Sequence, residues 1–177
     1  MREQPGTRWE YVSGVVIVLG GIVGVATGQR FDLFAADRLF APLGVLGASW
    51  ISGLPGGLPH SGGGLFMRPR DMAKLGQLVL GGGRWRGTPI VSEAWVREST
   101  QPLLPNVRTF GARAADYGYL WWRLPGGVIT AAGAQGQWIF AVPGADLVMI
   151  ATGEADGNFL SAPDFLYSHV LPAVTGG

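Results

Sequence analysis

Glycine constrains the fold of this 177-residue chain more than any other residue, because it fills 30 of the positions. That is about one residue in six, against roughly 7% in an average protein. The glycines follow no fixed period, which excludes a collagen-like structure. They gather instead in runs, such as residues 62–64 and 81–83. We therefore expect them to mark turns, helix ends and close approaches between backbone segments.

The composition excludes several classes of protein. With 47% hydrophobic residues and a formal net charge of +1, the chain lacks the signature of a disordered protein. Its 13 Lys and Arg against 12 Asp and Glu leave no basic excess for nucleic acid. The absence of cysteine excludes disulfides and thiolate metal sites, but it fits any compartment, so the localisation stays open.

The sequence contains no pattern that would bind a nucleotide or a metal. A phosphate-binding loop needs Gly-Lys-Ser/Thr, but the only lysine, Lys74, lies within a predicted helix, and no strand leads into G-x-G-x-x-G. The two histidines are predicted to be a loop residue, His60, and a residue near a helix C-terminus, His169. No G-x-S-x-G elbow surrounds any serine. We expect neither a metal nor a cofactor.

The most apolar stretch, residues 15–27, predicts a helix of about 20 Å, shorter than the roughly 30 Å core of a bilayer. Gly20 and Gly24 suit either a membrane helix interface or close packing of a buried helix. A signal peptide is disfavoured by Glu3 and Glu10 ahead of the run. We predict a buried core helix, with a signal or membrane segment and a strand as the alternatives.

Helix signals dominate the first part of the chain, and strand signals the second. Helical spacing or capping residues predict helices at residues 30–40, from Pro69 to the glycines at 81–83, at 92–96 with Ser92 as N-cap, and at 159–170. Aromatic or β-branched runs between glycine turns predict an antiparallel meander with strands at residues 117–124, 128–132, 137–142 and 147–152. Residues 43–64 have the composition of a loop. No repeat or interdomain linker is visible.

Tyr11 stands at the entrance to the apolar helix. A phenol with a pKa near 10 acts as a base only where neighbouring cations lower that pKa. Arg2 and Arg8 are near in sequence, but no lysine is. Taken alone, these residues favour a packed aromatic over a catalytic tyrosine.

Several blocks, in order, resemble the C-terminal half of a β-lactamase-related serine hydrolase. They are PGTRWEYVSG, HSGGGLFMRPRDMAKLGQLVLGGGRWRGTPIVSEAWV, YGYLWW and AAGAQGQWIFAVPGADLVMIATG. Between residues 5 and 153 the chain is similar to class C β-lactamases, related esterases and 6-aminohexanoate-dimer hydrolases. The resemblance implies an α+β fold, a β-lactamase/transpeptidase-like antiparallel sheet flanked by helices. That fold would be incomplete, since the N-terminal strands and the nucleophile helix are missing, so residues 1–177 would form a single C-terminal portion of the domain.

The resemblance also implies an active site of three elements. In this family a Ser-x-x-Lys supplies the nucleophile, and a Tyr-x-Asn or Tyr-x-Ser supplies a base or proton shuttle. A Lys-Thr-Gly strand, or a looser equivalent, lines the acyl pocket, and the backbone N–H just after it completes the oxyanion hole. Matched residue by residue, Tyr11 and Ser13 take the catalytic tyrosine element. The oxyanion and substrate-binding positions fall on Gly133, Ala134, Gly136 and Gln137, with the N–H of Ala134 as the oxyanion donor.

The chain departs from this pattern in two places. Ala131 and Ala132 replace the Lys and Thr of the strand, which argues against recognition of a β-lactam carboxylate there. Asp71, and no serine, precedes Lys74 by three positions, so Ser-x-x-Lys is absent from the sequence. The resemblance therefore implies a fragment that is inactive alone, from a parent enzyme that acts on small esters, amides or lactams.

Three functions remain open at this stage. The first is the inactive hydrolase fragment, which would associate with itself or with the missing N-terminal half. The second is a non-catalytic binding or regulatory module of the same fold. The third, which we do not favour, is a small membrane-associated protein anchored by residues 15–25.

Overall fold

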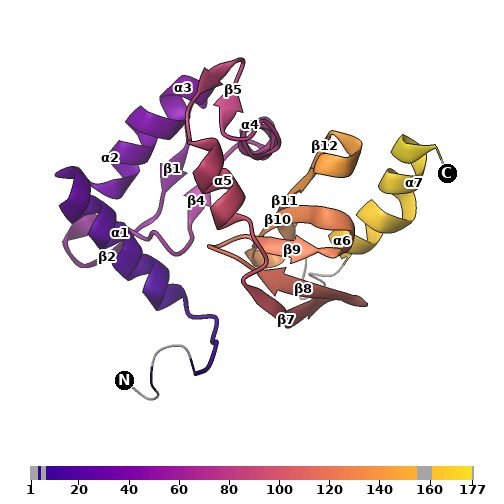
Figure 1. Ribbon diagram of the computed structural model, residues 1–177. Helices are drawn as coiled ribbons and strands as arrows, with labels where there is room; N and C mark the ends of the chain where they lie inside the picture. Colours follow the sequence, from indigo (N-terminus) through magenta and orange to yellow (C-terminus); the bar gives the residue numbers. More distant parts are fainter. Residues whose placement is uncertain (1–3, 5–6, 155–160, 177) are drawn as a thin grey trace. The chain divides into compact units, whose positions relative to one another are not determined.

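The computed structural model describes residue 4, residues 7–154 and residues 161–176 (Figure 1). The first two residues of the resemblance and of the expected closing helix, residues 5–6 and 159–160, lie outside these ranges. The chain divides into two compact units, Met1–Met67 and Arg68–Gly177. The assignment of residues 1–177 to a single domain portion stays a prediction.

The first unit combines a helical layer with two short antiparallel ribbons. Its helices are α1 (Ser13–Thr27), α2 (Phe31–Ala35) and α3 (Ala41–Leu43), with a π-helical turn, η1 (Ala36–Phe40), between the last two. Its strands are β1 (Ser49–Trp50), β2 (Ser52–Leu54), β3 (Leu58–Pro59) and β4 (Leu65–Phe66), with β1 paired to β4 and β2 to β3.

Three aromatic rings pack together in the first unit, and Phe40 among them is buried. The Trp50 ring lies 5.3 Å edge-on from Phe31 and 5.6 Å from Phe40, with which it stacks. This contact explains the helix predicted at residues 30–40, because both phenylalanines lie on the α2–η1 segment. The loop expected at residues 43–64 is wrong in part, because β1, β2 and β3 lie within it. Strands of two or three residues are too short to show an alternating pattern.

The prediction of a buried core helix at residues 15–27 is wrong. A helix forms there, α1, but none of its residues is buried. Its exposed side chains share one helical face and are Val15, Val18, Leu19, Ile22 and Val25. The whole helix is apolar, so its sequence could not indicate which face packs and which faces solvent.

Among the described residues, no single helix has both the length and the hydropathy to cross a membrane. One pair of helical segments, Ser13–Thr27 and Phe31–Leu43, meets these criteria only when taken together, and it bends by 74°.

The second unit is an antiparallel meander with helices. Its strands in the main sheet are β7 (Leu104–Phe110), β8 (Arg113–Tyr117), β9 (Trp122–Leu124), β10 (Val128–Gly133), β11 (Gln137–Val142) and β12 (Leu147–Ala151), in the order β12-β11-β10-β9-β8-β7. A small ribbon pairs β5 (Arg84–Trp85) with β6 (Thr88–Pro89). The helices are α4 (Pro69–Leu80), α5 (Glu93–Ser99), α6 (Ser161–Phe165) and α7 (Leu171–Thr175), with a π-helical turn, η6 (Leu166–Val170), between the last two.

Helices cover both faces of the sheet near its β12 edge. Helix α4 packs closely on one face, because a Cβ on Gly76 would lie 2.7 Å from Val148 and 3.1 Å from Ile139. Met149 alternates with Val148 along β12 and so points to the other face, where it lines a groove against the α6–η6 segment. The fully buried rings of Trp138 and Phe140 stack at 5.2 Å on β11, the strand next to β12.

The sequence-based predictions for this unit are mostly confirmed. Helix α4 begins at Pro69, and Ser92 caps α5 by accepting a hydrogen bond from the Trp95 N–H at 3.2 Å. The single strand expected at residues 117–124 is wrong in part: Tyr117 ends β8 and residues 122–124 form β9, but residues 118–121 form a turn between them. Strand β7 was not expected, since it contains Pro105 and polar residues.

Candidate functional site

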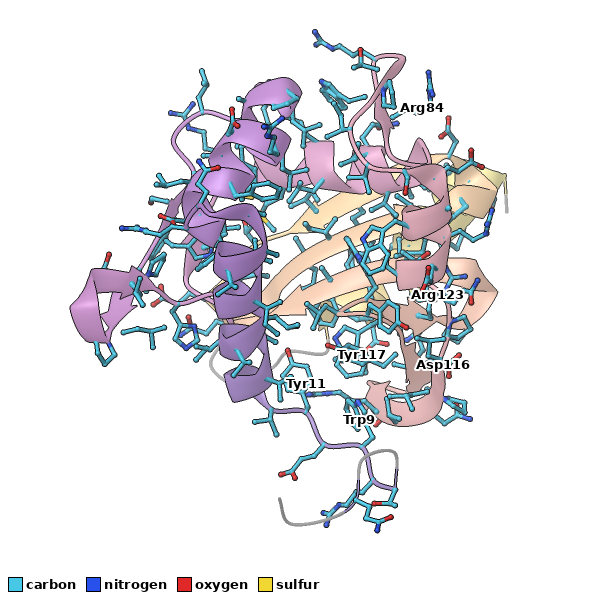
Figure 2. The ribbon with its side chains drawn as sticks, turned by 60° about the vertical axis from the view of Figure 1, so that its left-hand side comes forward. Trp9, Tyr11, Arg84, Asp116, Tyr117 and Arg123 are labelled. Atoms are coloured by element: carbon cyan, nitrogen blue, oxygen red, sulfur yellow. The ribbon has the colours of Figure 1, made fainter. Side chains whose placement is uncertain are left out.

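Tyr11 and Ser13 lie at the start of α1 in the first unit. Ser13 is the first helical residue, and Val12, at the N-cap position, is extended and gives no side-chain cap. The Tyr11 side chain is 51% exposed, and its ring lies 6.3 Å from that of Trp9 (Figure 2). The phenol therefore lies at the surface of this unit, where a substrate could reach it.

The glycine-rich loop that follows β3 holds the start of α1 in place. The Ser61 hydroxyl donates a 2.9 Å hydrogen bond to the Val16 carbonyl. Gly62 allows a close approach to Ser13, since a Cβ there would lie only 2.9 Å from the Ser13 carbonyl oxygen. The same Cβ would lie 3.1 Å from His60 Cε1. The His60 imidazole and Ser13 therefore both lie close to Gly62. Sequence reasoning treated His60 as a loop residue and missed this proximity, although the glycine run beside it was a signal of close packing.

The oxyanion and substrate-binding candidates of the sequence analysis form one hairpin in the second unit. Gly133 ends β10 and pairs with Gln137, which begins β11, so three residues, Ala134–Gly136, make the turn. The Gln137 side-chain amide donates a hydrogen bond to the Gly153 carbonyl. This bond ties the segment after β12 to the base of the hairpin.

Among the described residues, two other hairpins have the same backbone geometry as the Ala134–Gly136 turn. The turns Pro55–Gly57 and Pro125–Gly127 also place three residues between two strand residues that pair with each other. Both turns have the sequence Pro-Gly-Gly. Their middle glycines have φ of 76° and 72°, where Gln135 has 60°. Ala134 therefore stands where the other two turns have proline, and it keeps an N–H that proline lacks.

Gln135 adds a second departure from those turns. It adopts left-handed backbone geometry that the other hairpins assign to glycine, and a side chain in that region costs about 1 kcal/mol. Ala134 and Gln135 are both exposed. The hairpin thus presents a backbone donor and a strained residue at its tip, features that concentrate at functional sites.

The only lysine of the chain is engaged within α4. Its Nζ lies 2.6 Å from Asp71 Oδ1, one helical turn away, and Asp71 is buried. The position that a Ser-x-x-Lys would give to the serine is therefore occupied by the lysine's own ion-pair partner. Lys74 has no hydroxyl beside it on this turn to activate.

Two groups with shifted pKa values, Arg123 and Tyr167, lie in the main sheet and in the closing helical segment of the second unit. Asp116 and Arg123 are partners across β8 and β9 (Figure 2). Burial lowers the pKa of Arg123, and the charge of Asp116 opposes that shift. Burial raises the pKa of Tyr167 to about 12, although the Arg113 guanidinium, 4.3 Å above its ring, acts in the other direction. The Tyr167 hydroxyl donates a 2.6 Å hydrogen bond to the Pro125 carbonyl.

The structure groups the six predicted site residues into two sets. Tyr11 and Ser13 belong to the first unit, whereas Gly133, Ala134, Gly136 and Gln137 share one hairpin of the second. Across residues 4, 7–154 and 161–176, no group of three or more His, Asp or Glu side chains is arranged to hold a metal ion. Backbone N–H polarisation and proton transfer by a phenol are the chemistry that these two sets can offer.

Comparisons with known proteins match almost the whole chain. The Beta-lactamase family model matches residues 1–164. A curated 6-aminohexanoate-dimer hydrolase from Paenarthrobacter ureafaciens is 27% identical over 158 residues, which are 85% of this chain and 40% of that protein. The chain therefore spans less than half the length of this relative.

Solved structures share the fold. A Bacillus anthracis protein assigned as a 6-aminohexanoate-dimer hydrolase superposes with a TM-score of 0.81 at 20% identity, over 98% of this chain and 46% of that one. A penicillin-binding protein from Bacillus halodurans gives a TM-score of 0.65 at 18% identity, over 94% of this chain and 58% of that one. These likenesses confirm the expected α+β arrangement of an antiparallel sheet flanked by helices, present in part.

Proposed function

Because the chain belongs to the beta-lactamase family, we propose that it supplies two elements of a serine hydrolase active site, the tyrosine element at Tyr11 and the oxyanion hairpin at Ala134. The family match and the curated hydrolase relative support a serine hydrolase-like function at the level of the family. The substrates we propose are small esters and amides, lactams included, cleaved through an acyl-serine.

The chemistry divides between the elements as follows. A serine hydroxyl attacks the carbonyl carbon, and a neighbouring base takes its proton, because the neutral hydroxyl is a weak nucleophile. The Tyr11 phenol passes a proton between this hydroxyl and the leaving group. The carbonyl oxygen becomes an oxyanion, which the Ala134 N–H stabilises, and loss of one such donor costs about 10²–10³ in rate. Water then releases the acyl group from the serine.

The observation that carries this proposal is the residue at position 134. The chain uses proline at the same place in two hairpins of the same geometry, and there it has no donor. At the hairpin that the family resemblance assigns to the oxyanion, alanine retains the donor. A turn with only a structural role would gain nothing from alanine in place of proline.

The nucleophile must come from outside these 177 residues, because they contain no Ser-x-x-Lys. We therefore propose that the chain alone forms no acyl-enzyme. Incubation of the purified chain with a fluorophosphonate or a fluorescent penicillin, followed by mass spectrometry, tests this. We expect no adduct, and a covalent adduct on any of its serines contradicts the proposal.

The missing Ser-x-x-Lys also favours a second candidate, a non-catalytic binding module of the same fold. The two candidates differ when the chain is co-expressed with the part of the Paenarthrobacter relative that it does not match. A serine hydrolase element restores hydrolysis of a chromogenic ester in that mixture. A binding module binds ester or amide ligands with or without the added part and never accelerates their cleavage.

A further inference from the structure

An exposed aromatic stack lies on the second unit, apart from the candidate site residues. The rings of Trp95, on α5, and Tyr119, in the turn between β8 and β9, are stacked with centroids 5.8 Å apart and planes 20° apart. Trp95 is 50% exposed and Tyr119 is 48% exposed. About half of each side chain is therefore open to a ligand that could pack against the ring.

The turn that carries Tyr119 is rigidly seated on the end of α5. The Tyr119 N–H donates a 2.9 Å hydrogen bond to the Ser99 carbonyl, and the Gly118 N–H donates one of 2.8 Å to the Trp121 carbonyl. A Cβ on Gly118 would lie 2.5 Å from the Gln101 carbonyl oxygen and 2.7 Å from that of Ser99. Because the backbone fits this closely, the stack is held in place before any ligand arrives.

Leu120 completes the surface beside the stack at a conformational cost. Its φ is +67°, a left-handed geometry that glycine or asparagine adopts more easily, and its side chain is 50% exposed. A leucine here gains little from burial and strains the backbone. Its presence is explained if the side chain contacts something that binds.

The strand register places this surface at the same end of the sheet as the oxyanion hairpin. Trp122 of β9 is the partner of Thr130 of β10, and the two strands are antiparallel. The turn of residues 118–121 therefore precedes β9 at the end where β10 runs on into Ala134–Gly136. Adjacent strands are about 4.8 Å apart, and Ala134 lies four residues past Thr130, about 13 Å along β10, so one extended small substrate can span both turns.

We propose that Trp95, Tyr119 and Leu120 form a subsite for a flat, uncharged apolar group, such as an aromatic ring, on an ester or amide whose carbonyl lies at the Ala134 N–H. The inference rests on the proposed function, which supplies the carbonyl position. Ring faces and an aliphatic side chain recognise such a group by stacking and by exclusion of water. The subsite selects among substrates and takes no part in the chemical step.

Because the chain has no Ser-x-x-Lys, it can bind an amide without cleaving it, so binding is measured directly by ligand-observed NMR. The probes are N-benzylacetamide and N-methylacetamide, which differ only in the ring. We expect the benzyl compound to bind more tightly. Trp95→Ala and Tyr119→Ala should each weaken it by about two- to tenfold, the value of one aromatic contact, and should leave the methyl compound unchanged. Equal binding of the two probes overturns the subsite.

Leu120→Gly separates recognition from folding. Glycine suits the left-handed backbone, so the variant should be at least as stable as the parent while it binds the benzyl probe less well. Phe165→Ala is the matched control, since Phe165 is 54% exposed and lines the separate groove beside β12. If Phe165→Ala weakens binding of the benzyl probe and Trp95→Ala does not, the ring binds in that groove. This result overturns the inference.

Ala134→Pro distinguishes this inference from the proposed function. If both hold, Ala134→Pro weakens the two probes by the same factor, whereas Trp95→Ala weakens only the benzyl probe. If Trp95→Ala acts and Ala134→Pro does not, the subsite stands and the oxyanion role of Ala134 fails. If only Ala134→Pro acts, the oxyanion role stands and the subsite fails.

Discussion

Ser61 occupies the space that a side chain on Gly20 would need. A Cβ on Gly20 would lie 2.7 Å from Ser61 Cβ and 3.2 Å from the Phe31 ring, while the Ser61 hydroxyl is bonded to the Val16 carbonyl on the same helix. The glycine-rich loop thus reaches the backbone of α1 only because residue 20 has no side chain. The position of Tyr11, just ahead of α1, depends on this join.

Gly20→Ala should therefore destabilise the first unit by about 1–3 kcal/mol, because the loop must move away from α1. Urea unfolding followed by circular dichroism measures the change. Gly21→Ala is the matched control, since a Cβ there meets nothing within 4 Å, and it should be neutral or stabilising by up to about 1 kcal/mol. Equal effects of the two substitutions would show that the close contact between Ser61 and α1 contributes nothing to the stability of the unit.

Ala134→Pro should leave the fold intact, because two other hairpins of the chain have proline at the same place. If the added part of the Paenarthrobacter relative restores hydrolysis, this variant should lower the restored kcat by about 10²–10³ through loss of one oxyanion donor. Thermal melting provides the folding control. An unchanged kcat in a folded Ala134→Pro variant would exclude the N–H from the reaction.

Tyr11→Phe removes only the phenolic hydroxyl from a half-exposed ring that contacts Trp9. We expect it to abolish restored hydrolysis while the chain still associates with the added part, as size-exclusion chromatography would show. Trp9→Phe keeps an aromatic ring at the neighbouring position and serves as the control. Full turnover by Tyr11→Phe would remove the tyrosine from the mechanism.

Tyr167 should make the second unit sensitive to alkali. Its pKa is raised to about 12 in the folded chain, mainly by burial, against about 10 when unfolded. The folded state therefore holds this proton more tightly, so the stability it provides is complete below pH 10 and is lost as the pH rises towards 12. Tyr167→Phe should show a smaller loss of stability between pH 9 and about 11 in urea titrations. Parallel curves for the two proteins would contradict the assignment.

The sequence predicted those parts of the fold that local signals determine. Pro69 and the following glycines bounded α4, Ser92 capped α5, and glycine turns separated β10, β11 and β12. It failed where tertiary contacts decide. The turn at residues 118–121 depends on hydrogen bonds from Tyr119 to Ser99, about twenty residues away, so a continuous aromatic run looked like one strand.

The candidate site was predictable only in part, and for a similar reason. The family resemblance gave Tyr11, Ser13 and the hairpin around Ala134 by their order along the chain. It could not give the approach of His60 to Ser13, which depends on the absent side chain of Gly62. The stack of Trp95 on Tyr119 joins residues 24 positions apart, and no periodicity links a short helix to a turn.

The two outer strands of the main sheet differ in what they offer to a further strand. Strand β7 carries Pro105, Arg108 and a left-handed Asn106, features that discourage pairing along an edge. Strand β12 reads Leu-Val-Met-Ile-Ala, with no charge, proline or bulge. The two edges of the meander therefore differ. The β7 edge discourages pairing with a further strand, whereas the β12 edge is compatible with extension by main-chain hydrogen bonds.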